Sequence, residues 1–561
     1  MQNLILLFLF PFSIFAASDE PIFGENGMVV STSKQASNAG IEILKKGGNA
    51  IDAAVAVGFA LAVTSSSNGN LGGGGFLVFV NNNGESFTLD HREKAPKASN
   101  RDMFLDDNQE VVPGMSLYSR AGSGVPGTVD GLIKALNDHG SGKISLRQAI
   151  APAIRLAGQG FNLSYYEAER FNAYKNFFEQ NNAAAKIFIK KNGKPWNKGD
   201  RFIQRDLEKT LKRISNYGRD GFYSGLVAEL IVKEMKKGNG LISLDDLKEY
   251  SSEYRKPVSG TYKNFNIVSM GPPSSGGALL INMLNMLEHY PLDSIGWNSS
   301  GYVHLLTEVE RRAYADRAVH MGDPDFWDVP LSMLTSKKYA KHRIQSIDLK
   351  KATPSIEIKA SKKYIYESPE TTHYSIVDQW GNAVSVTTTI NLSYGNGHIV
   401  EGAGFFLNNE MDDFSSKPGV PNAFGLIGNE ANSIKPEKRP LSSMTPTIIL
   451  KDKKPFMVIG SPGGSTIITT TMQCILNVID HKMDIKAAVT AARFHSQWLP
   501  DVIQVEPYGL VNDVSENLKN RGHTIIQYRG GYIGEANGIL ITEEGYFGGG
   551  DSRGETSALG Y

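Results

Sequence analysis

Two threonines, Thr371 and Thr389, are the strongest candidates for chemistry, because both lie in a stretch with the pattern of a β-hairpin. Residues 373–377 and 383–390 are rich in β-branched side chains, as strands are. A three-residue hairpin loop favours glycine at its end, and Gly381 would end a loop of residues 379–381. This loop puts Thr371 opposite Thr389, whereas a bulge at Gly381 would shift the pairing by one residue.

A threonine hydroxyl is a poor nucleophile at neutral pH, because it holds its proton tightly. If the chain is cut between Glu370 and Thr371, the new α-amino group, with a pKa of about 7.7–8.0, can act as general base for the hydroxyl. Thr371 can make this cut itself by attacking the preceding carbonyl group. Taken alone, however, the pair is more typical of an ordinary threonine-rich strand.

A glycine pair offers a site for a developing negative charge. In GSPGGS, residues 460–465, Gly463 and Gly464 can turn successive backbone N–H groups toward one point. The helix predicted to begin near Ser465 adds its positive end to the same place. The motif therefore fits an oxyanion hole, a tight strand-to-helix turn, or both.

Two further motifs carry charged side chains. Arg92 follows a predicted strand, and arginine matches a carboxylate with two parallel hydrogen bonds. Glu410, Asp412 and Asp413 lie close together in LNNEMDDFS and could bind a cation. Taken by themselves, Arg92 is more ordinarily a surface charge and the acidic segment is more ordinarily a solvated turn.

Eight segments, in this order, together resemble the γ-glutamyltransferase (γ-glutamyltranspeptidase) family of N-terminal-nucleophile hydrolases. The resemblance spans the chain from about residue 27 to its last residue. The segments are GGNAIDAAVA from Gly47, GNLGGGGF from Gly69, HREKAP from His91, GVPGTVDG from Gly124, TTHYS from Thr371, LNNEMDDFS from Leu407, KRPLSSMTP from Lys438 and GSPGGS from Gly460.

The resemblance implies an α+β fold, the four-layer αββα sandwich of N-terminal-nucleophile hydrolases. It implies that Thr371 cuts the chain and later acts as the nucleophile, and that Thr389 orients the Thr371 hydroxyl. Gly463 and Gly464 would form the oxyanion hole. No metal and no cofactor are expected, and the sequence contains no H-x-x-x-H or H-E-x-x-H pair.

The resemblance also implies how the amino-acid head of a γ-glutamyl group is bound. Arg92 would bind the α-carboxylate together with Ser442 and Ser443. Asp413 would face the α-ammonium group, and Glu410 and Asn391 complete the implied binding set.

A lid loop over the substrate is also implied, and it corresponds to residues 417–435. Many relatives have a tyrosine where this chain has Phe424. Because the phenol hydroxyl is absent, a hydrogen bond from the lid to Asn391 is lost, and we expect this lid to close by packing alone.

The implied reaction takes the γ-glutamyl group of glutathione or another γ-glutamyl compound onto Thr371 as an ester. Water, an amino acid or a dipeptide then accepts the group. One alternative is a β-lactam side-chain acylase of the same superfamily that acts on glutaryl groups, which lack the α-ammonium and have no need of Asp413. Another is a catalytically dead secreted binding protein, against which the intact Thr371, Thr389 and glycine pair argue.

The chain has 561 residues, of which 41% are hydrophobic and 21% charged, and its formal net charge is zero. This balance argues against a nucleic-acid partner or an anionic membrane surface. Residues 1–17 resemble a secretory signal peptide, although no Lys or Arg precedes the apolar run at 4–15, which is too short to span a bilayer. We therefore expect a secreted protein of the periplasm, with no membrane attachment in its mature form.

The predicted products of the cut are a large subunit, 18–370, and a small subunit, 371–561. Both would contribute strands to one composite domain and stay together as a heterodimer. The polar, basic segment 350–369 reads as the linker that the cut releases.

Several expectations concern the supporting structure. Residues 50–63 predict a buried helix capped by Asn49. Residues 302–320 predict a long helix whose Arg311, Arg312 and Arg317 are solvated or paired on one face. The lone Cys474 predicts a buried, inert thiol, and His373 and His495, although near the site in sequence, are expected to be structural.

Overall fold

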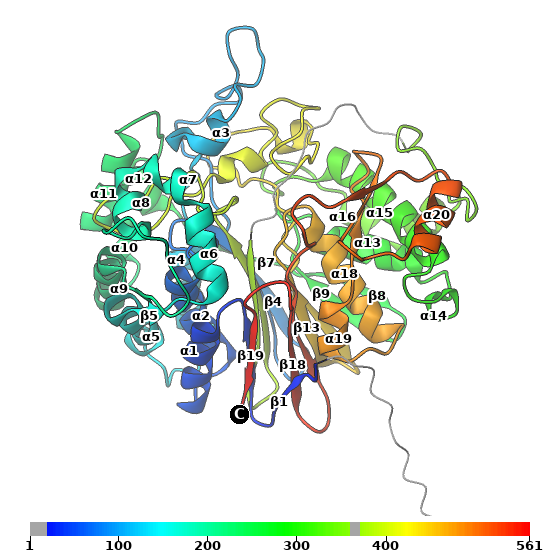
Figure 1. The fold of residues 1–561 in the computed structure, drawn as a ribbon, viewed down its shortest axis with the longest axis horizontal. Coiled ribbons are helices and arrows are strands. Elements are labelled where there is room, and N and C mark those ends of the chain that lie inside the picture. The colour runs from blue at the N-terminus through cyan, green and yellow to red at the C-terminus, as the bar shows by residue number, and fades with distance from the viewer. Residues whose placement is uncertain (1–18, 359–370) are drawn as a thin grey trace, which may run out of the picture.

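The computed structural model describes residues 19–358 and 371–561. The predicted signal peptide and the bond between Glu370 and Thr371 lie outside these residues. Two seven-stranded antiparallel sheets stack face to face at the centre, and helices cover the outer face of each, as Figure 1 shows. The expected α+β fold with four layers is therefore confirmed.

The first sheet contains the predicted hairpin at its centre. Its order is β19 (Ser557–Gly560), β2 (Met28–Ser31), β10 (Thr372–Val377), β11 (Ala383–Thr389), β3 (Gly74–Val80), β4 (Ser86–Asp90) and β7 (Glu253–Arg255). The second sheet runs β1 (Ile22–Gly24), β18 (Tyr546–Gly550), β17 (Asn537–Ile541), β13 (Lys454–Gly460), β12 (Thr447–Lys451), β9 (Phe265–Ser269) and β8 (Val258–Tyr262).

The central strands of the first sheet, β2, β10, β11 and β3, are buried on both faces, whereas the edge strands β7 and β19 are partly exposed. In β3, Phe76 and Val78 pack between the sheets against Val458 and Ile539 of the second sheet. The intervening Leu77 instead packs with the helical layer. This alternation follows from the two-residue period of a strand.

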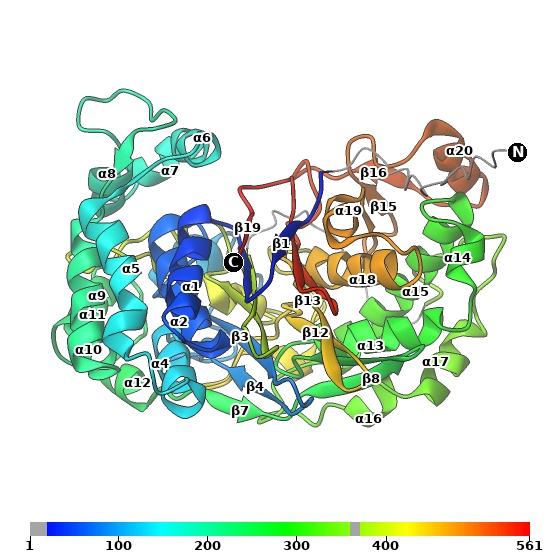
Figure 2. The ribbon, with the colours of Figure 1, turned by 90° about the horizontal axis from the view of Figure 1, so that it is seen from below.

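The helical layers divide along the sequence. The first sheet is covered by α1 (Lys34–Lys45), α2 (Ala50–Thr64) and α4 (Thr128–His139), with α5 (Leu146–Gln159) and α9 (Arg205–Tyr217) outside them. The second is covered by α13 (Gly276–Leu287), α18 (Thr466–Ile479) and α19 (Ile485–Thr490), with α15 (Ser300–His320) behind. Figure 2 shows the two layers from below, on opposite sides of the strands.

Helix α2 begins and is buried as the sequence predicts. The Asn49 side chain accepts a hydrogen bond from the Asp52 N–H, and the Asp52 carboxylate accepts one from the Asn49 N–H. All residues of α2 are buried, and small side chains let the helix lie close to β10 and β11.

None of the helices in residues 19–358 and 371–561 has the length and apolarity needed to cross a bilayer.

The hairpin has the predicted register, with no bulge at Gly381. Thr372 pairs with Thr388 and Val377 pairs with Ala383. Gly381 has φ +81°, and the Asp378 N–H donates to the Asn382 carbonyl over 3.1 Å. The pairing, continued by one residue, places Thr371 opposite Thr389.

Helix α15 differs from its prediction in one respect. Arg311, Arg312 and Arg317 are all buried rather than solvated. The predicted pairing holds for two of them, because Arg311 and Arg312 both contact the Glu308 carboxylate on the same helix. The helix is buried on all sides, so its charges must find partners inside the protein.

The carboxylate of Asp378 joins the hairpin loop to α2. It accepts hydrogen bonds from the N–H groups of Ala50, Trp380 and Asn382, over 2.9, 2.9 and 3.0 Å. We expect Asp378→Ala to destabilise the fold by about 2–4 kcal/mol, because buried N–H groups lose their acceptor. Chemical unfolding would measure this. Trp380→Ala, in the same loop but half-exposed, should cost less than about 1 kcal/mol; equal effects would contradict the role of Asp378.

Candidate active site

One small cavity collects most of the residues predicted from the sequence. Nine of the ten candidate site residues line it, and the tenth, Gly463, lies beside it. We call it the inner cavity. Its lining consists of Arg92, Arg317, Thr371, Thr389, Asn391, Glu410, Asp413, Phe424, Leu426, Ser442, Ser443, Met444, Gly464 and Ile467.

The pleat of the hairpin directs both threonines toward the second sheet. Ser375 of β10 and Ser385 of β11 donate hydrogen bonds to carbonyl groups of that sheet, over 3.0 and 3.2 Å. Thr371 and Thr389 share their parity, so they face the same side. Both are almost fully buried, and the Thr389 hydroxyl accepts a hydrogen bond from the Asn391 N–H over 2.8 Å.

The glycine run before β3 makes room for this arrangement. A side chain on Gly73 would lie 2.1 Å from the Thr389 carbonyl oxygen. Asn70 fixes the close approach, because its amide donates to that carbonyl over 2.9 Å and accepts from the Gly73 N–H over 2.9 Å. The glycine run therefore lets β3 pack closely against the backbone at Thr389.

The glycine pair lies where the sequence predicts, between β13 and α18. Gly463 has φ +138° and Gly464 has φ +55°, and both conformations favour glycine. A side chain on Gly464 would lie 2.5 Å from the Phe424 ring. Gly463 and Gly464 each line a cavity that Thr371 also lines, so the start of α18 lies near this threonine.

Arg92 lies within a cluster of three acids. Its guanidinium group makes ion pairs with Glu410 and Asp413, and it also lies 3.6 Å from the Glu93 carboxylate. All four side chains are buried or nearly so. The predicted carboxylate-binding arginine and the predicted ammonium-binding acid are therefore paired with each other.

The excess of acid changes the protonation of the cluster. Burial raises the pKa of Glu93 to about 7, although Arg92 opposes the shift. Burial also raises the pKa of Glu410 and of Asp413, again against the effect of Arg92. Three acids around one guanidinium favour the entry of a second cationic group.

Other polar groups of the inner cavity suit a bound amino-acid head. Among the described residues, no donor reaches the buried Asn391 Oδ1, although its Nδ2 donates to the Asn409 carbonyl over 2.9 Å. Arg317 of α15, which sequence analysis did not assign to the site, donates to the Ser443 hydroxyl over 3.3 Å and to the Ser275 hydroxyl over 3.0 Å. The cavity thus offers an acceptor for an ammonium group and a second guanidinium group for a carboxylate.

The predicted lid folds over the inner cavity. Phe424 is buried against Gly464, and its carbonyl accepts a hydrogen bond from Gln497 over 3.1 Å. Two neighbours bind the acidic turn: Asn422 donates to Asp413 over 3.1 Å and the Ala423 N–H donates to Asp412 over 2.9 Å. The expectation that the lid closes by packing alone is therefore wrong, because backbone and amide hydrogen bonds also hold it.

The two histidines near the site are structural, as expected. His373 contacts the hydroxyls of Thr387 and Ser375, and burial lowers its pKa to about 3. His495 contacts Thr469 and Gln497, and burial lowers its pKa to about 4. Cys474 is buried, as predicted.

One group of side chains has the spacing of metal ligands, in His304, Glu308 and His523. The two imidazole rings contact each other over 2.7 Å, and Glu308 contacts Arg311 and Arg312. Two guanidinium groups beside the carboxylate oppose a cation, so the group is better described as a hydrogen-bonded network.

The arrangement defines a class of protein. Two stacked antiparallel sheets between helical layers, with a buried threonine at the start of a central strand and N–H donors beside it, are the features of an N-terminal-nucleophile hydrolase. The sequence profile described as Gamma-glutamyltranspeptidase matches residues 36–561. The chain belongs to the γ-glutamyltranspeptidase family.

Individual relatives agree with this assignment. The chain is 45% identical over 525 residues to the glutathione hydrolase proenzyme of Escherichia coli (strain K12), covering 94% of this chain and 90% of that protein. It is 33% identical to the acylase ACY 1 proenzyme of Pseudomonas sp. (strain SE83), covering 91% and 89%.

Solved structures are similar as well. A chain of Helicobacter pylori gamma-glutamyltranspeptidase matches with TM-score 0.58 and 45% identity, covering 61% of this chain and 96% of that one. A cephalosporin acylase from Bacillus halodurans matches with TM-score 0.84 over 99% of both chains; at 23% identity it supports the fold alone.

The pKa of Glu93 predicts how stability depends on pH. An unfolded glutamate has a pKa of about 4.3, so between pH 5 and 7 the unfolded chain is ionised at Glu93 while the folded protein keeps the proton. The contribution of Glu93 to stability is therefore present at low pH and is lost as pH rises through about 7. We expect the thermal unfolding midpoint of Glu93→Gln to fall less than that of the parent protein between pH 5 and 7. In the exposed variant Glu543→Gln, the unfolding midpoint should change with pH as it does in the parent protein. The same pH dependence in Glu93→Gln as in the parent would contradict the raised pKa of Glu93.

Proposed function

We propose that this chain is the precursor of a γ-glutamyltransferase that also hydrolyses glutathione. The observation that carries the proposal is the pairing of Arg92 with Asp413 beside Thr371 in one buried cavity. A γ-glutamyl group has one α-carboxylate and one α-ammonium, which match these two side chains. The family membership supports the same reaction.

In this proposal the substrate head enters between Arg92 and Asp413. The α-carboxylate replaces Asp413 at the guanidinium group, with Ser442 and Ser443 alongside. The ammonium group replaces Arg92 at Asp413, and Glu410 and the open Asn391 Oδ1 accept its other hydrogens. Each charge exchanges one buried partner for another, so neither is left unpaired.

The chemistry proposed for Thr371 follows from its surroundings. The α-amino group freed by cleavage takes the hydroxyl proton, and Thr389 orients the hydroxyl. The oxygen attacks the γ-carbonyl carbon, the oxyanion lies at Gly463 and Gly464, and the protonated amine leaves. Water or an amine then releases the γ-glutamyl group from the ester. The apolar side chains of Leu426, Met444 and Ile467 line the same cavity and suit the two methylene groups.

The proposed maturation of the chain begins with its export. Residues 1–17 would be removed on secretion to the periplasm, and Thr371 would then cut the bond after Glu370. The resulting subunits, 18–370 and 371–561, would remain together, because β10 and β11 are paired with β2 and β3. The E. coli relative is named a proenzyme, and the H. pylori chain matches 61% of this sequence, close to the share of residues 18–370.

A glutaryl acylase is the second candidate, because relatives named acylases are 33% identical over most of the chain. A glutaryl group would leave Asp413 without a cationic partner other than Arg92. The buried acids Glu93, Glu410 and Asp413 outnumber the guanidinium group that they contact. Burial raises the pKa of Glu93 and of Glu410, and either group can give up its proton beside an incoming ammonium group, which favours the γ-glutamyl substrate.

Donor selectivity tests the proposal. We expect the wild type to prefer a γ-glutamyl anilide to the matching glutaryl anilide, and Asp413→Asn to lower kcat/KM for the γ-glutamyl donor by about 100-fold with a much smaller effect on the glutaryl donor. Asp107→Asn, which removes an exposed carboxylate outside the lining of the inner cavity, should leave both rates unchanged. Steady-state hydrolysis measures all six rates, with two donors for each of the three enzymes. A wild type that prefers the glutaryl donor would support the acylase instead.

A further inference from the structure

Two buried asparagines lie on either side of the glycine run before β3. They belong to the segments GNLGGGGF and LNNEMDDFS, but neither is among the candidate site residues. Asn70 is 6% exposed and Asn408 is 1% exposed. The side-chain oxygen of each faces backbone N–H groups, which can only donate, so the orientation of both amides is fixed. Each asparagine therefore directs its Nδ2 group toward carbonyls.

Asn70 connects the glycine run to the end of β11. Its Nδ2 group donates to the Thr389 carbonyl over 2.9 Å. Its Oδ1 atom accepts from the Gly73 N–H over 2.9 Å and from the Thr128 hydroxyl over 2.7 Å. Thr389 is the last residue of its strand, and the chain turns at Asn391, which has φ +74°. The bond from Asn70 thus fixes the backbone at the point where the strand ends.

Helix α4 supports the same glycine from the other side. The N–H groups of Gly127 and Thr128 both donate to the Gly73 carbonyl, over 2.8 and 3.0 Å. The first N–H groups of a helix have no partner within the helix, so they are available for this carbonyl. Because the Thr128 hydroxyl also donates to Asn70, the start of α4 and the amide form one hydrogen-bonded support behind Thr389.

Asn408 connects the glycine run to the acidic turn. Its Nδ2 group donates to the Gly72 carbonyl over 2.7 Å and to the Gly124 carbonyl over 2.8 Å. Its Oδ1 atom accepts from the Gly124 N–H over 2.8 Å and from the Glu410 N–H over 3.0 Å. The last bond is an Asx turn, which starts the short 3-10 helix η2 (Glu410–Asp413). This helix carries acids of the inner cavity.

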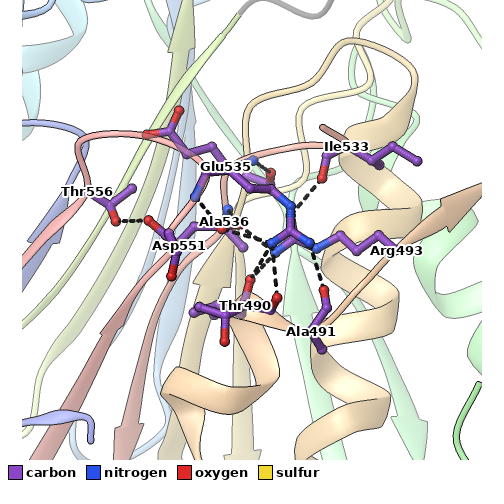
Figure 3. Close-up of polar contacts among 12 residues, drawn as sticks. Thr490, Ala491, Arg493, Ile533, Glu535, Ala536, Asp551 and Thr556 are labelled. Carbon is purple, nitrogen blue, oxygen red and sulfur yellow. Dashed lines mark hydrogen bonds and ion pairs between the residues drawn. The ribbon is translucent and has the colours of Figure 1, made fainter. Parts of the chain in front are cut away.

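Neutral amides suit this place, because three acids already surround Arg92. An amide donates and accepts hydrogen bonds without adding a charge, whereas a further charged group would change the protonation of the acids. The buried network in Figure 3 works differently. There the Arg493 guanidinium group donates to the Ile533 carbonyl and to the Asp551 carboxylate, over 2.6 Å each. None of the residues labelled in Figure 3 lines the inner cavity.

We propose that Asn70 and Asn408 are positioning residues with separate tasks. Asn70 places Thr389 and, through it, the Thr371 hydroxyl. Asn408 places the acidic turn that takes the ammonium group of the substrate. The tasks are separate because each amide bonds a different residue of the glycine run and a different segment beyond it. This inference rests on the proposed function.

Self-cleavage distinguishes the two tasks, because it uses the Thr371 hydroxyl but no γ-glutamyl head. A variant that misplaces Thr389 slows both self-cleavage and turnover. A variant that misplaces the acidic turn weakens the binding of the head. L-glutamate carries the same amino-acid head as a γ-glutamyl donor, so its constant for competitive inhibition measures head binding without chemistry.

The first variant tests Asn70. We expect Asn70→Ala to lower kcat for a γ-glutamyl anilide by about 10- to 100-fold and to slow self-cleavage by a similar factor. The inhibition constant of L-glutamate should stay within about twofold of wild type, because the contact acts on the reacting groups and not on the head. The fraction of uncut chain against time after cell-free synthesis gives the self-cleavage rate, and steady-state hydrolysis gives the other two quantities.

A milder variant and a matched control accompany it. Thr128→Val removes one donor to Asn70 and keeps the rest, so it should change the same two rates in the same direction by a smaller factor. It replaces Asn70→Ala in the test if that variant does not fold. Thr210→Val removes another buried threonine hydroxyl, which donates to the Ala403 carbonyl over 2.8 Å. This control should match wild type in all three measurements.

The second variant tests Asn408. We expect Asn408→Ala to raise the inhibition constant of L-glutamate by about tenfold or more, because the acidic turn loses a buried hydrogen bond. Its self-cleavage should proceed within about threefold of the wild-type rate, since the head-binding groups take no part in that step. In Asn408→Ser the hydroxyl can accept the Glu410 N–H, so this variant should recover part of the L-glutamate binding. It also replaces Asn408→Ala if that variant does not fold.

The outcomes separate this inference from the proposed function. Equal effects of the two asparagine variants on all three measurements, no effect of either, or slow turnover with normal self-cleavage in Asn70→Ala would overturn the separate tasks. Each of these results would leave the transferase assignment in place. A wild type that neither hydrolyses the γ-glutamyl anilide nor binds L-glutamate would instead overturn the proposed function.

Discussion

The register of the β10–β11 hairpin is the constraint on which the rest of the site depends. Successive residues of a strand face opposite sides of a sheet, so a slip of one residue would turn Thr389 away from Thr371. The loop ending at Gly381 and the carboxylate of Asp378 hold this register from one end. Close packing of Gly73 on the Thr389 carbonyl holds it from the other.

The second physical feature is a buried cluster in which three acidic side chains surround the single guanidinium group of Arg92. Burying ions is costly unless each has a partner, and the guanidinium group of Arg92 is the partner of Glu410 and Asp413 in the described residues. A cluster of this kind adds little to stability but discriminates strongly between ligands. A ligand that brings both a cation and an anion can enter without leaving a charge unpaired, whereas a purely anionic or purely neutral head cannot.

Much of the fold and site could be predicted because the relevant signals are local. The Asn49 cap, the Gly381 loop and the hairpin pairing follow from short-range rules, and the glycine pair marks the start of α18. The gathering of Arg92, Asn391 and Asp413 around Thr371 did not follow from such rules and came only from the resemblance to a family. Their roles stay predictions, although the structure brings the residues to one cavity.

What the sequence did not reveal depends on contacts between distant elements. Arg317 was interpreted as a surface or paired residue, because periodicity identifies a helix without telling which elements bury it. The polar residues of α15 are spread around the helix and do not gather on one face, and Glu308 is spaced to contact Arg311 and Arg312. These two features were the available signal that the arginines are buried. Two further features were missed for the same reason. The hydrogen bond from Asn422 of the lid depends on Asp413 of another segment, and the role of Glu93 depends on its burial beside Arg92.

The proposed reaction depends on Thr371, which lines the inner cavity together with Arg92 and Asp413. Its α-amino group would be freed only by the cut after Glu370, so self-cleavage is the step that must come first. The most direct test is the intact mass and N-terminal sequence of the purified wild type beside Thr371→Ala. The account predicts two wild-type chains, one beginning Thr-Thr-His, and a single uncut chain in the variant. A single wild-type chain, or a cut in Thr371→Ala at the same bond, would contradict it.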